Sequence, residues 1–444
     1  MAITATAATF VVLGCLREAG SIWISVGLLS IIFVLCWRNF DGGRHPCFLF
    51  LGMLLLFQGG RLFGYVIGGE RDPMTIDVQT PTPISISSSS AELTLLILVL
   101  SAILIYFPCR LHFTPAQLWP DSGTRWLPAL YALLILTLPF ALYKNIAYLS
   151  YIRSHGGYLA VYTDNAAVLQ SAGLVARVGS LINGTAMLVL YVIETRTKRI
   201  AIIVFLFFGL SLLDLLIGFR GKFFSQVISM WYIYKLKKGT RFRFGQLAVA
   251  AVIIAVVSIV AAAFRENNAL SVISPIGFIV NQGVSLNVTT GAVEFHQLFA
   301  RHGWHYLWGG FVEGLTPAAL GPGQSWSGDL SNFLNPVASK LGFGTASDYL
   351  AELYLAASIP GVIVGSLAIG YCLHFLHKAT AHTLGAIILA FVLPSVMYLP
   401  RLELLNPVAI LIKSSFALLA VCFFVAAYDL FATALQIGPH RRIA

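Results

Sequence analysis

The sequence predicts an all-α, polytopic integral membrane protein with about twelve transmembrane helices. Of its 444 residues, 58% are hydrophobic and only 10% are charged, which is more apolar surface than a water-soluble core can bury. Apolar runs long enough to cross a bilayer recur from one end of the chain to the other. We therefore interpret residues 1–444 as a single membrane domain.

The segments expected to span the membrane are, in chain order, residues 2–16, 20–37, 46–67, 91–107, 127–143, 173–193, 200–218, 223–236, 246–263, 350–376, 383–399 and 407–434. The first has no basic region before it and no small-residue cleavage site, so we interpret it as a short span and not as a cleaved signal peptide. The run at 223–236 is shorter than the roughly twenty residues that a span normally needs.

Positive charge sets the orientation. Lysine and arginine collect in "WRNFDGGRH", "ETRTKR" and "KLKKGTRFRF", which fall on one side if each run crosses once, and such loops stay in the cytoplasm. Both termini are then cytoplasmic. The net charge of +10 reflects this orientation and the anionic headgroups of the lipid bilayer, and it does not indicate nucleic acid as a partner.

The sequence offers little for disulfides or metals. Most of the six cysteines fall in spans or on the reducing side, so no disulfide framework is expected. His302 and His305, with Glu294 and His296, can be drawn as a zinc site, but such a set without cysteine in a flexible loop is a weak signal. We expect no cofactor.

Two outer segments are the expected functional loops. Residues 144–165 form a smaller periplasmic loop with Arg153 and Tyr158. Residues 264–349 form a large periplasmic loop, and a loop of that length in a compact protein is usually functional. The large loop carries Arg265, Arg301, His302, Trp304, His305, Trp308 and Trp326. Its apolar content predicts short helices packed over an outward-facing cavity. Its aromatic side chains and Tyr158 either stack on a ligand or anchor the interface.

The stretch "IGFRGKFF" keeps two cations beside the bilayer. At about 1.5 Å per residue from Arg199, Arg220 lies roughly 30 Å away, at the outer edge of the hydrocarbon. Arg220 and Lys222 either form a site for a multiply charged anion, with arginine as a planar fork for phosphate oxygens, or snorkel as an ordinary turn.

The segment "GFGTASDYLAELYLAASIPGVIVG" leads from the large loop into a span. Asp348 and Glu352 lie one helical turn apart and share a face. Asp348 is either a substrate ligand or a helix cap favoured by the helix dipole. Glu352 lies deeper, where a carboxylate needs a cation as a partner or serves in proton transfer.

The run ending in "LLIGFRGKFF", followed by a long outer loop ending in "GFGTASDYLAELYLAASIPGVIVG", resembles the Wzy-type polymerases of O-antigen and other oligosaccharide repeat units. The resemblance covers the whole chain and implies a GT-C-like fold in the bacterial inner membrane. Some members carry arginine followed at fixed spacing by glycine in both outer loops. Neither Arg153, Arg265 nor Arg301 has that glycine, which weakens roles carried over to these three.

The resemblance implies a metal-independent glycosyltransferase that acts on undecaprenyl-pyrophosphate-linked oligosaccharide at the outer leaflet. Arg220 and Glu352 are then catalytic. Arg220, Lys222, Arg265 and Arg301 bind pyrophosphate. Arg153, Tyr158, His302, Trp304, His305 and Asp348 bind sugar. The resemblance also points to a chain-length regulator and a flippase as partners.

Two alternatives stay open at this point. An O-antigen ligase shares the topology and the donor but transfers the glycan to a lipid A core sugar. A flippase would line a central path with charge, for which Arg61, Arg177, Asp214 and Lys413 are the candidates; the same four residues also suit pairing or snorkelling near helix ends.

Overall fold

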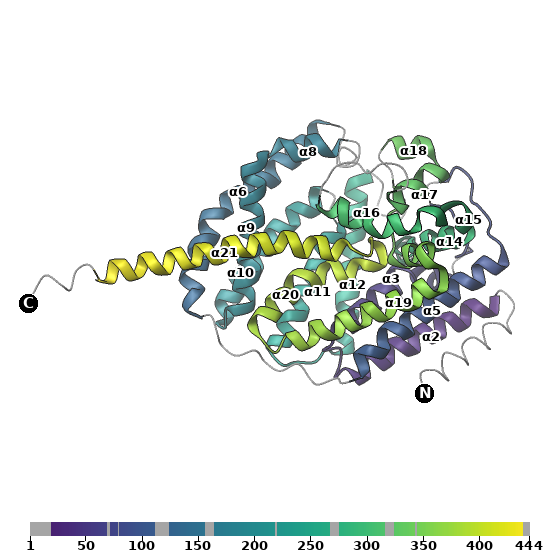
Figure 1. Cartoon of the computed structure of the whole chain (residues 1–444), viewed down its shortest axis with the longest axis horizontal. Coiled ribbons are helices and arrows are strands. Elements are labelled where there is room, and N and C mark those ends of the chain that lie inside the picture. Colours follow the sequence, from purple (N-terminus) through teal and green to yellow (C-terminus); the bar gives the residue numbers. More distant parts are fainter. Residues whose placement is uncertain are drawn as a thin grey trace, which may run out of the picture. The chain divides into compact units, whose positions relative to one another are not determined.

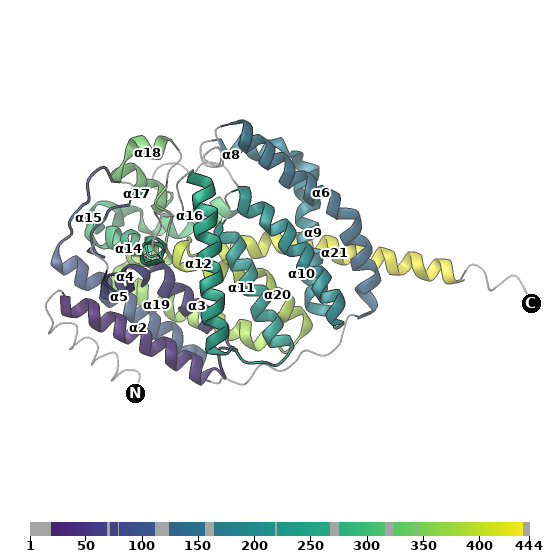
Figure 2. The ribbon, with the colours of Figure 1, turned by 180° about the vertical axis from the view of Figure 1, so that it is seen from behind.

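The computed structural model describes residues 19–68, 72–78, 80–111, 124–155, 164–217, 220–266, 275–315, 324–341 and 344–437. Over these ranges the chain is helical, with an isolated bridge between Ile76 and Ile84. The chain divides into two compact units (Figures 1 and 2). The first comprises Met1–Gln117, Tyr234–Ala379 and Leu393–Ala409, and the second comprises Leu118–Ile233, Thr380–Val392 and Ile410–Ala444.

The first unit contains α2 (Ala19–Asn39), α3 (Pro46–Phe57), α4 (Gly60–Val66), α5 (Ser88–Arg110), α12 (Phe244–Glu266), α19 (Tyr349–Ala379) and η5 (Leu399–Arg401). Helices α2 and α19 both pack along α5. Small polar side chains join α5 to α19: Tyr349 Oη lies 2.9 Å from Ser101 Oγ, and Ser366 Oγ donates to the same oxygen at 2.8 Å. Hydrogen bonds between spans keep buried hydroxyl groups satisfied where no water is available.

The segment predicted as the large loop is built from short helices wherever it is described. They are α13 (Pro275–Gln282), α14 (Ser285–Glu294), α15 (His296–Phe299), η4 (Ala300–His302), α16 (Gly303–Leu315), α17 (Trp326–Leu334) and α18 (Pro336–Lys340). An apolar core lies among them and the start of α19, formed by Ile76, Val288, Ala292, Tyr306, Trp326, Leu330, Leu334, Ala351 and Leu355. Burial of these side chains holds the short helices, which would be unstable alone.

The second unit contains η1 (Thr124–Trp126), α6 (Leu127–Ser154), α8 (Asn165–Ser171), α9 (Gly173–Ile193) and α10 (Thr197–Ile217). Helices α11 (Arg220–Lys237), α20 (Thr383–Tyr398) and α21 (Asn406–Ile437) hold residues of both units. Helix α6 packs lengthwise on α9. Tyr148, Ile152, Val168, Ala172 and Ile217 make a small core at one end of this unit.

Eight helices of the described chain are long and apolar enough to cross a membrane. The pair α3 and α4, bent by 59°, makes nine if it counts as one span. The expected first span, 2–16, lies outside the described residues. Those expected at 223–236 and 246–263 are helical as α11 and α12, although neither is among the eight. The total of about twelve stays a prediction.

The smaller loop predicted over 144–165 differs from the structure in its first half. Helix α6 continues to Ser154, because the run from Lys144 to Ser154 contains alanine, leucine, isoleucine and tyrosine without a glycine or proline to end a helix. The described non-helical part before α8 is therefore short.

Candidate active site

Helix α19 begins with a buried acid as its cap. Asp348 Oδ1 accepts the N–H of Leu350 at 2.9 Å, satisfying one of the donors that a helix start leaves open. Its other oxygen accepts the hydroxyl of Thr289 from α14, and the side chain of Gln58 is also a hydrogen-bond partner. The side chain has no exposed surface, and this burial raises the pKa of Asp348 to about 6. Its charge therefore changes just below neutral pH.

Glu352 lies one turn further along α19 and is also fully buried. Ser347 Oγ donates to its Oε1 at 2.7 Å, and the backbone N–H of Leu404 donates to its Oε2 at 2.8 Å. A carboxylate oxygen can accept two hydrogen bonds, so each oxygen keeps a lone pair for another partner. This side chain is fixed in place and remains chemically competent as a base.

A second acid, Glu403, stands beside Glu352. Glu403 is 8% exposed, and the two carboxyl groups interact electrostatically. The chain brings Glu403 here through the turn between η5 and α21, directly before Leu404. Gly310 of α16 packs so closely on it that a Cβ at this glycine would lie 2.0 Å from Glu403 Cβ. Helix α16 therefore packs directly against Glu403.

Helix α19 is broken just past these acids. Ala357 and Ser358 leave the helical conformation, with φ of +53° at Ser358, and Pro360 cannot donate the next helical hydrogen bond. His296 Nε2 lies 3.2 Å from Ser358 Oγ, and its ring packs edge-on against Tyr354 at 5.0 Å between centroids. A non-glycine residue in this backbone region stores strain that the surroundings must offset.

Four residues predicted to bind substrate lie beside this break, on η4 and α16. They are Arg301, His302, Trp304 and His305. Gly303 allows the approach, since a Cβ there would lie 2.1 Å from the carbonyl oxygen of Leu355. Trp304 is 64% exposed, and Arg301 and His305 are exposed as well. The first unit thus places these side chains close to the helix that carries Asp348 and Glu352.

A further buried polar layer lies between α4, the connector after it and α14. Arg61, 5% exposed, pairs with Asp77 and donates to the carbonyl oxygen of Thr75 at 3.3 Å. Asn287 donates to the same carbonyl oxygen and to Asp77, at 3.1 and 3.0 Å. The positive charge of Arg61 is therefore paired with Asp77 inside the first unit.

Several predicted site residues have side chains outside the part of the chain that the structure describes. Arg220 and Lys222 stand in the first turn of α11, and Arg265 near the end of α12, but their side chains are outside the described part. Tyr158 is outside the described residues altogether. Arg153 is exposed in the last turn of α6. A meeting of Arg220 with Glu352 therefore stays a prediction.

Three residues considered from the sequence have other roles here. Trp326 has no exposed surface and packs against Phe299 and Tyr306, so it belongs to the core and is not open to a sugar. Glu294 accepts the N–H and the hydroxyl of Ser87 at 3.2 and 3.0 Å, and His296 is tied to the break in α19. Neither is directed at His302 and His305.

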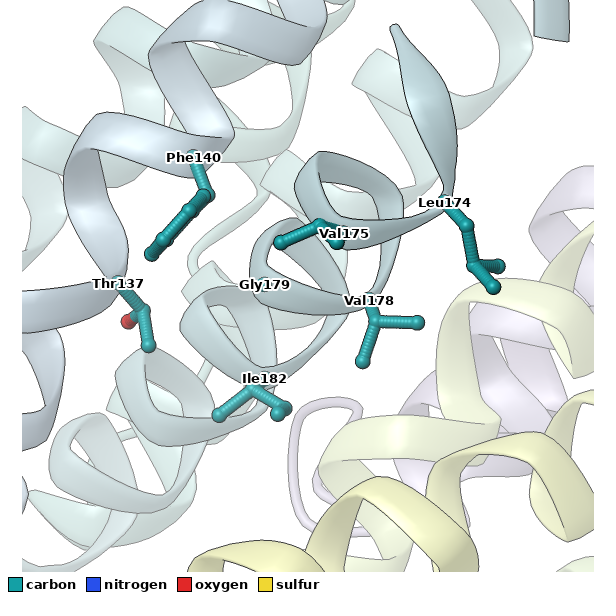
Figure 3. A pocket seen from close by; sticks show the side chains of 7 residues that line it. All are labelled: Thr137, Phe140, Leu174, Val175, Val178, Gly179 and Ile182. Atoms are coloured by element: carbon teal, nitrogen blue, oxygen red, sulfur yellow. The ribbon is translucent and has the colours of Figure 1, made fainter. Parts of the chain in front are cut away.

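The second unit has an apolar hollow between α6 and α9 with a volume of about 390 Å³. Figure 3 shows its lining, with Thr137 and Phe140 from α6 and Leu174, Val175, Val178, Gly179 and Ile182 from α9. Elsewhere in this unit Arg177 interacts electrostatically with both Tyr148 and Lys413. The second unit thus holds an apolar hollow between α6 and α9. Elsewhere it carries the cationic side chains Arg177 on α9 and Lys413 on α21.

Sequence reasoning missed Glu403, Gln58 and Thr289. Glu403 carries a recognisable signal, because an acid in the apolar stretch "LPRLELLNP" needs a reason to be there. Gln58 and Thr289 carry none, since single polar residues in apolar helices are common and only the fold brings them to Asp348.

Comparison with protein families gives a match over almost the full length. The model of the family described as O-antigen polysaccharide polymerase Wzy matches residues 2–430, which is nearly the whole chain and includes residues of both units. No curated protein and no solved structure matches the chain.

Proposed function

The chain belongs to the O-antigen polysaccharide polymerase Wzy family, and from that premise we propose how it joins lipid-linked oligosaccharide repeat units into surface polysaccharide. The observation that carries the proposal is Glu352, a fully buried carboxyl group that is held by two hydrogen bonds. Burial of a carboxylate in a membrane protein costs free energy, so a buried carboxylate held in a fixed orientation is expected to serve a function.

The proposed reaction is a glycosyl transfer at the outer leaflet. The donor is a growing glycan on undecaprenyl pyrophosphate, and the acceptor is the terminal sugar of another lipid-linked unit. The acceptor oxygen attacks the anomeric carbon of the donor as the bond from that carbon to the phosphate oxygen breaks. The acceptor proton goes to Glu352, and undecaprenyl pyrophosphate leaves with the bonding electrons. The base holds the acceptor in line and removes a proton in the transition state.

Access to Glu352 requires a movement of its cover. Its two present partners, Ser347 Oγ and Leu404 N–H, leave one lone pair on each oxygen. The acceptor hydroxyl reaches one of them when α16 or the turn at Glu403 shifts outward.

Cations stabilise the leaving group in this mechanism. Arg220 and Lys222 carry the charge that develops on the pyrophosphate, supported by Arg265 and Arg301. Fixed positive groups that act at the transition state supply this stabilisation electrostatically, and we propose transfer that is independent of a metal ion.

The sugars bind on the outer surface of the first unit, over His302, Trp304 and His305. Trp304 offers an exposed ring face for stacking. Arg153 and Tyr158 are further sugar-binding residues in this proposal. Asp348 lies one turn from Glu352 and is fully buried. It therefore contacts the acceptor sugar only after that sugar has entered beside Glu352.

The proposed membrane arrangement keeps about twelve spans in a GT-C-like fold. The 264–349 segment is periplasmic, and both termini are cytoplasmic, as the positive loops indicate. A flippase supplies the repeat units, and a chain-length regulator acts on the product.

The test is polymerisation by purified protein in detergent, with lipid-linked repeat units as the substrate. A ladder of glycan lengths from the wild type and from Glu92→Gln, with single units alone from Glu352→Gln, supports the proposal. Glu92 lies near the start of α5, just after its first turn, and is the matched control. A ladder from Glu352→Gln overturns the assignment of the base.

A further inference from the structure

Six thiol and imidazole side chains gather at the end of the first unit where α2, α3, α5 and α19 meet. They are Cys36, His45, Cys47, Cys109, His374 and His377, all buried. The mechanism proposed above uses none of them. His374 lies 22 residues beyond Glu352 on the same helix, roughly 30 Å away at the helical rise, so the cluster is separate from the candidate active site.

The local sequence explains why they converge. His45 caps α3, its Nδ1 accepting the N–H of Cys47 at 3.1 Å. Cys109 lies in the last turn of α5, and its Sγ donates to the carbonyl oxygen of Gly370 on α19 at 3.3 Å. His374 and His377 are three residues apart and therefore share the face of α19 that packs here.

Three of these residues already have the spacing of a metal site. One ligand atom each from His45, Cys47 and Cys109 lie within 4.8 Å of one another. A tetrahedral zinc ion with ordinary bond lengths needs ligand separations of about 3.4–3.8 Å, so each pair closes by at most about 1.4 Å. Such a movement is within the reach of side-chain rotation alone.

Two further groups stand next to these three. The thiol of Cys36 is a hydrogen-bond partner of Cys47. The ring of His377 lies 4.5 Å from that of His45, and the ring of His374 lies 6.4 Å from it, centroid to centroid. A four-ligand set can therefore be completed either by a third sulfur or by a second nitrogen.

We propose that His45, Cys47 and Cys109, with Cys36 or His377 as the fourth ligand, bind a zinc-type ion that ties α3 and α5 to their neighbours. Thiolate and imidazole are the ligands that zinc prefers, and a closed set without an open position is typical of a structural site. On binding, each cysteine that serves as a ligand releases its thiol proton.

The packed thiols and imidazoles could instead be ordinary core, because free cysteine behaves as a small apolar side chain. Metal analysis of the full chain separates the two explanations. The protein is purified in detergent with a reductant, incubated with zinc, desalted, and analysed for metal content and for its X-ray absorption at the zinc edge. The proposal predicts about one zinc per chain with at least two sulfur ligands, and a melting temperature that falls when a strong chelator removes the ion.

A pair of variants sharpens the test. Cys47→Ser combined with Cys109→Ser should lose the zinc, while Cys372→Ser, an exposed cysteine on α19, should retain it. Cys36→Ser and His377→Gln tested singly identify the fourth ligand by the one that lowers zinc affinity. If the double variant does not fold, the absorption spectrum and the chelator experiment on the wild type decide. Wild type without zinc, zinc without sulfur ligands, or zinc retained in the double variant overturns the proposal.

Discussion

Glu352→Gln tests the proposed base with little disturbance. The amide oxygen still accepts the N–H of Leu404, and the amide nitrogen donates to Ser347 Oγ, which accepts in place of donating. The variant should fold with nearly the wild-type melting temperature and should lose roughly 100- to 10,000-fold in kcat, the usual contribution of general base catalysis. Turnover is measured as glycan bonds formed per protein per unit time.

Glu352→Ala provides the contrast. It removes the acceptor of a buried N–H, at a cost of about 1–3 kcal/mol in the free energy of unfolding. If Glu352 is only a structural acceptor, the glutamine variant should stay active while the alanine variant loses stability and activity together.

Asp348 gives a pH dependence of stability. Because burial raises its pKa to about 6, the folded protein holds this proton more tightly than the unfolded chain does. The stability it adds is fully present below about pH 4 and is lost as the pH rises through about 6, at a cost of up to about 3 kcal/mol. Asp348→Asn should make the melting temperature less dependent on pH between about pH 4 and 6.

The measurement is best made in the Glu352→Gln background, because Glu352 interacts electrostatically with Asp348. Melting temperatures of the two proteins, with and without Asp348→Asn, are then compared at several pH values. The same dependence of melting temperature on pH in both proteins would contradict the raised pKa of Asp348.

At the scale of single elements, the break in α19 makes an unusual prediction. Ser358 holds φ of +53°, where glycine has no steric penalty and alanine does. Ser358→Gly and Ser358→Ala both lose the contact of the hydroxyl with His296, so their difference isolates the backbone. The glycine variant should be more stable than the alanine variant by about 1 kcal/mol.

Thermal unfolding of the two variants decides. In a continuous helix the order would reverse, because alanine is favoured over glycine by about 1 kcal/mol at such a position. An alanine variant that is the more stable of the two therefore means that α19 has no break here.

The sequence predicts the helices well and their interruptions poorly. The apolar run 173–193 coincides with α9, and the run 127–143 forms the first part of α6, because about twenty apolar residues in lipid leave few alternatives to a helix. The break at Ser358 was not expected, although Pro360 two residues later is a local signal for it. Glu352 was singled out correctly as a buried acid, whereas its partner Leu404 is a backbone group with no signature in the sequence.

For the whole molecule, the distribution of positive charge predicts which ends of the helices face the cytoplasm. Lys238, after α11, and Lys340, at the end of α18, are both exposed and both belong to the first unit. With Lys340→Cys, a maleimide that cannot cross membranes should label intact cells whose outer membrane has been permeabilised. With Lys238→Cys it should label only after lysis. The reverse pattern would invert the orientation.

Arg220 is the remaining test at the scale of the whole molecule, because the proposed mechanism requires this cation at the leaving pyrophosphate of the substrate on which Glu352 acts. Arg220→Ala should remove a charge-assisted contact to the leaving pyrophosphate worth about 2–4 kcal/mol. If that contact is made only in the transition state, kcat falls by roughly 30- to 1000-fold. Arg220→Lys keeps the charge but not the planar fork, so its kcat should lie between those of the wild type and Arg220→Ala.

Arg196→Ala, at an exposed arginine before α10, controls for the loss of a positive charge and should leave turnover unchanged. Equal amounts of inserted protein are verified first, and the ladder of glycan lengths is then compared. A wild-type ladder from Arg220→Ala would remove the arginine from the mechanism and leave Glu352 to be explained without it.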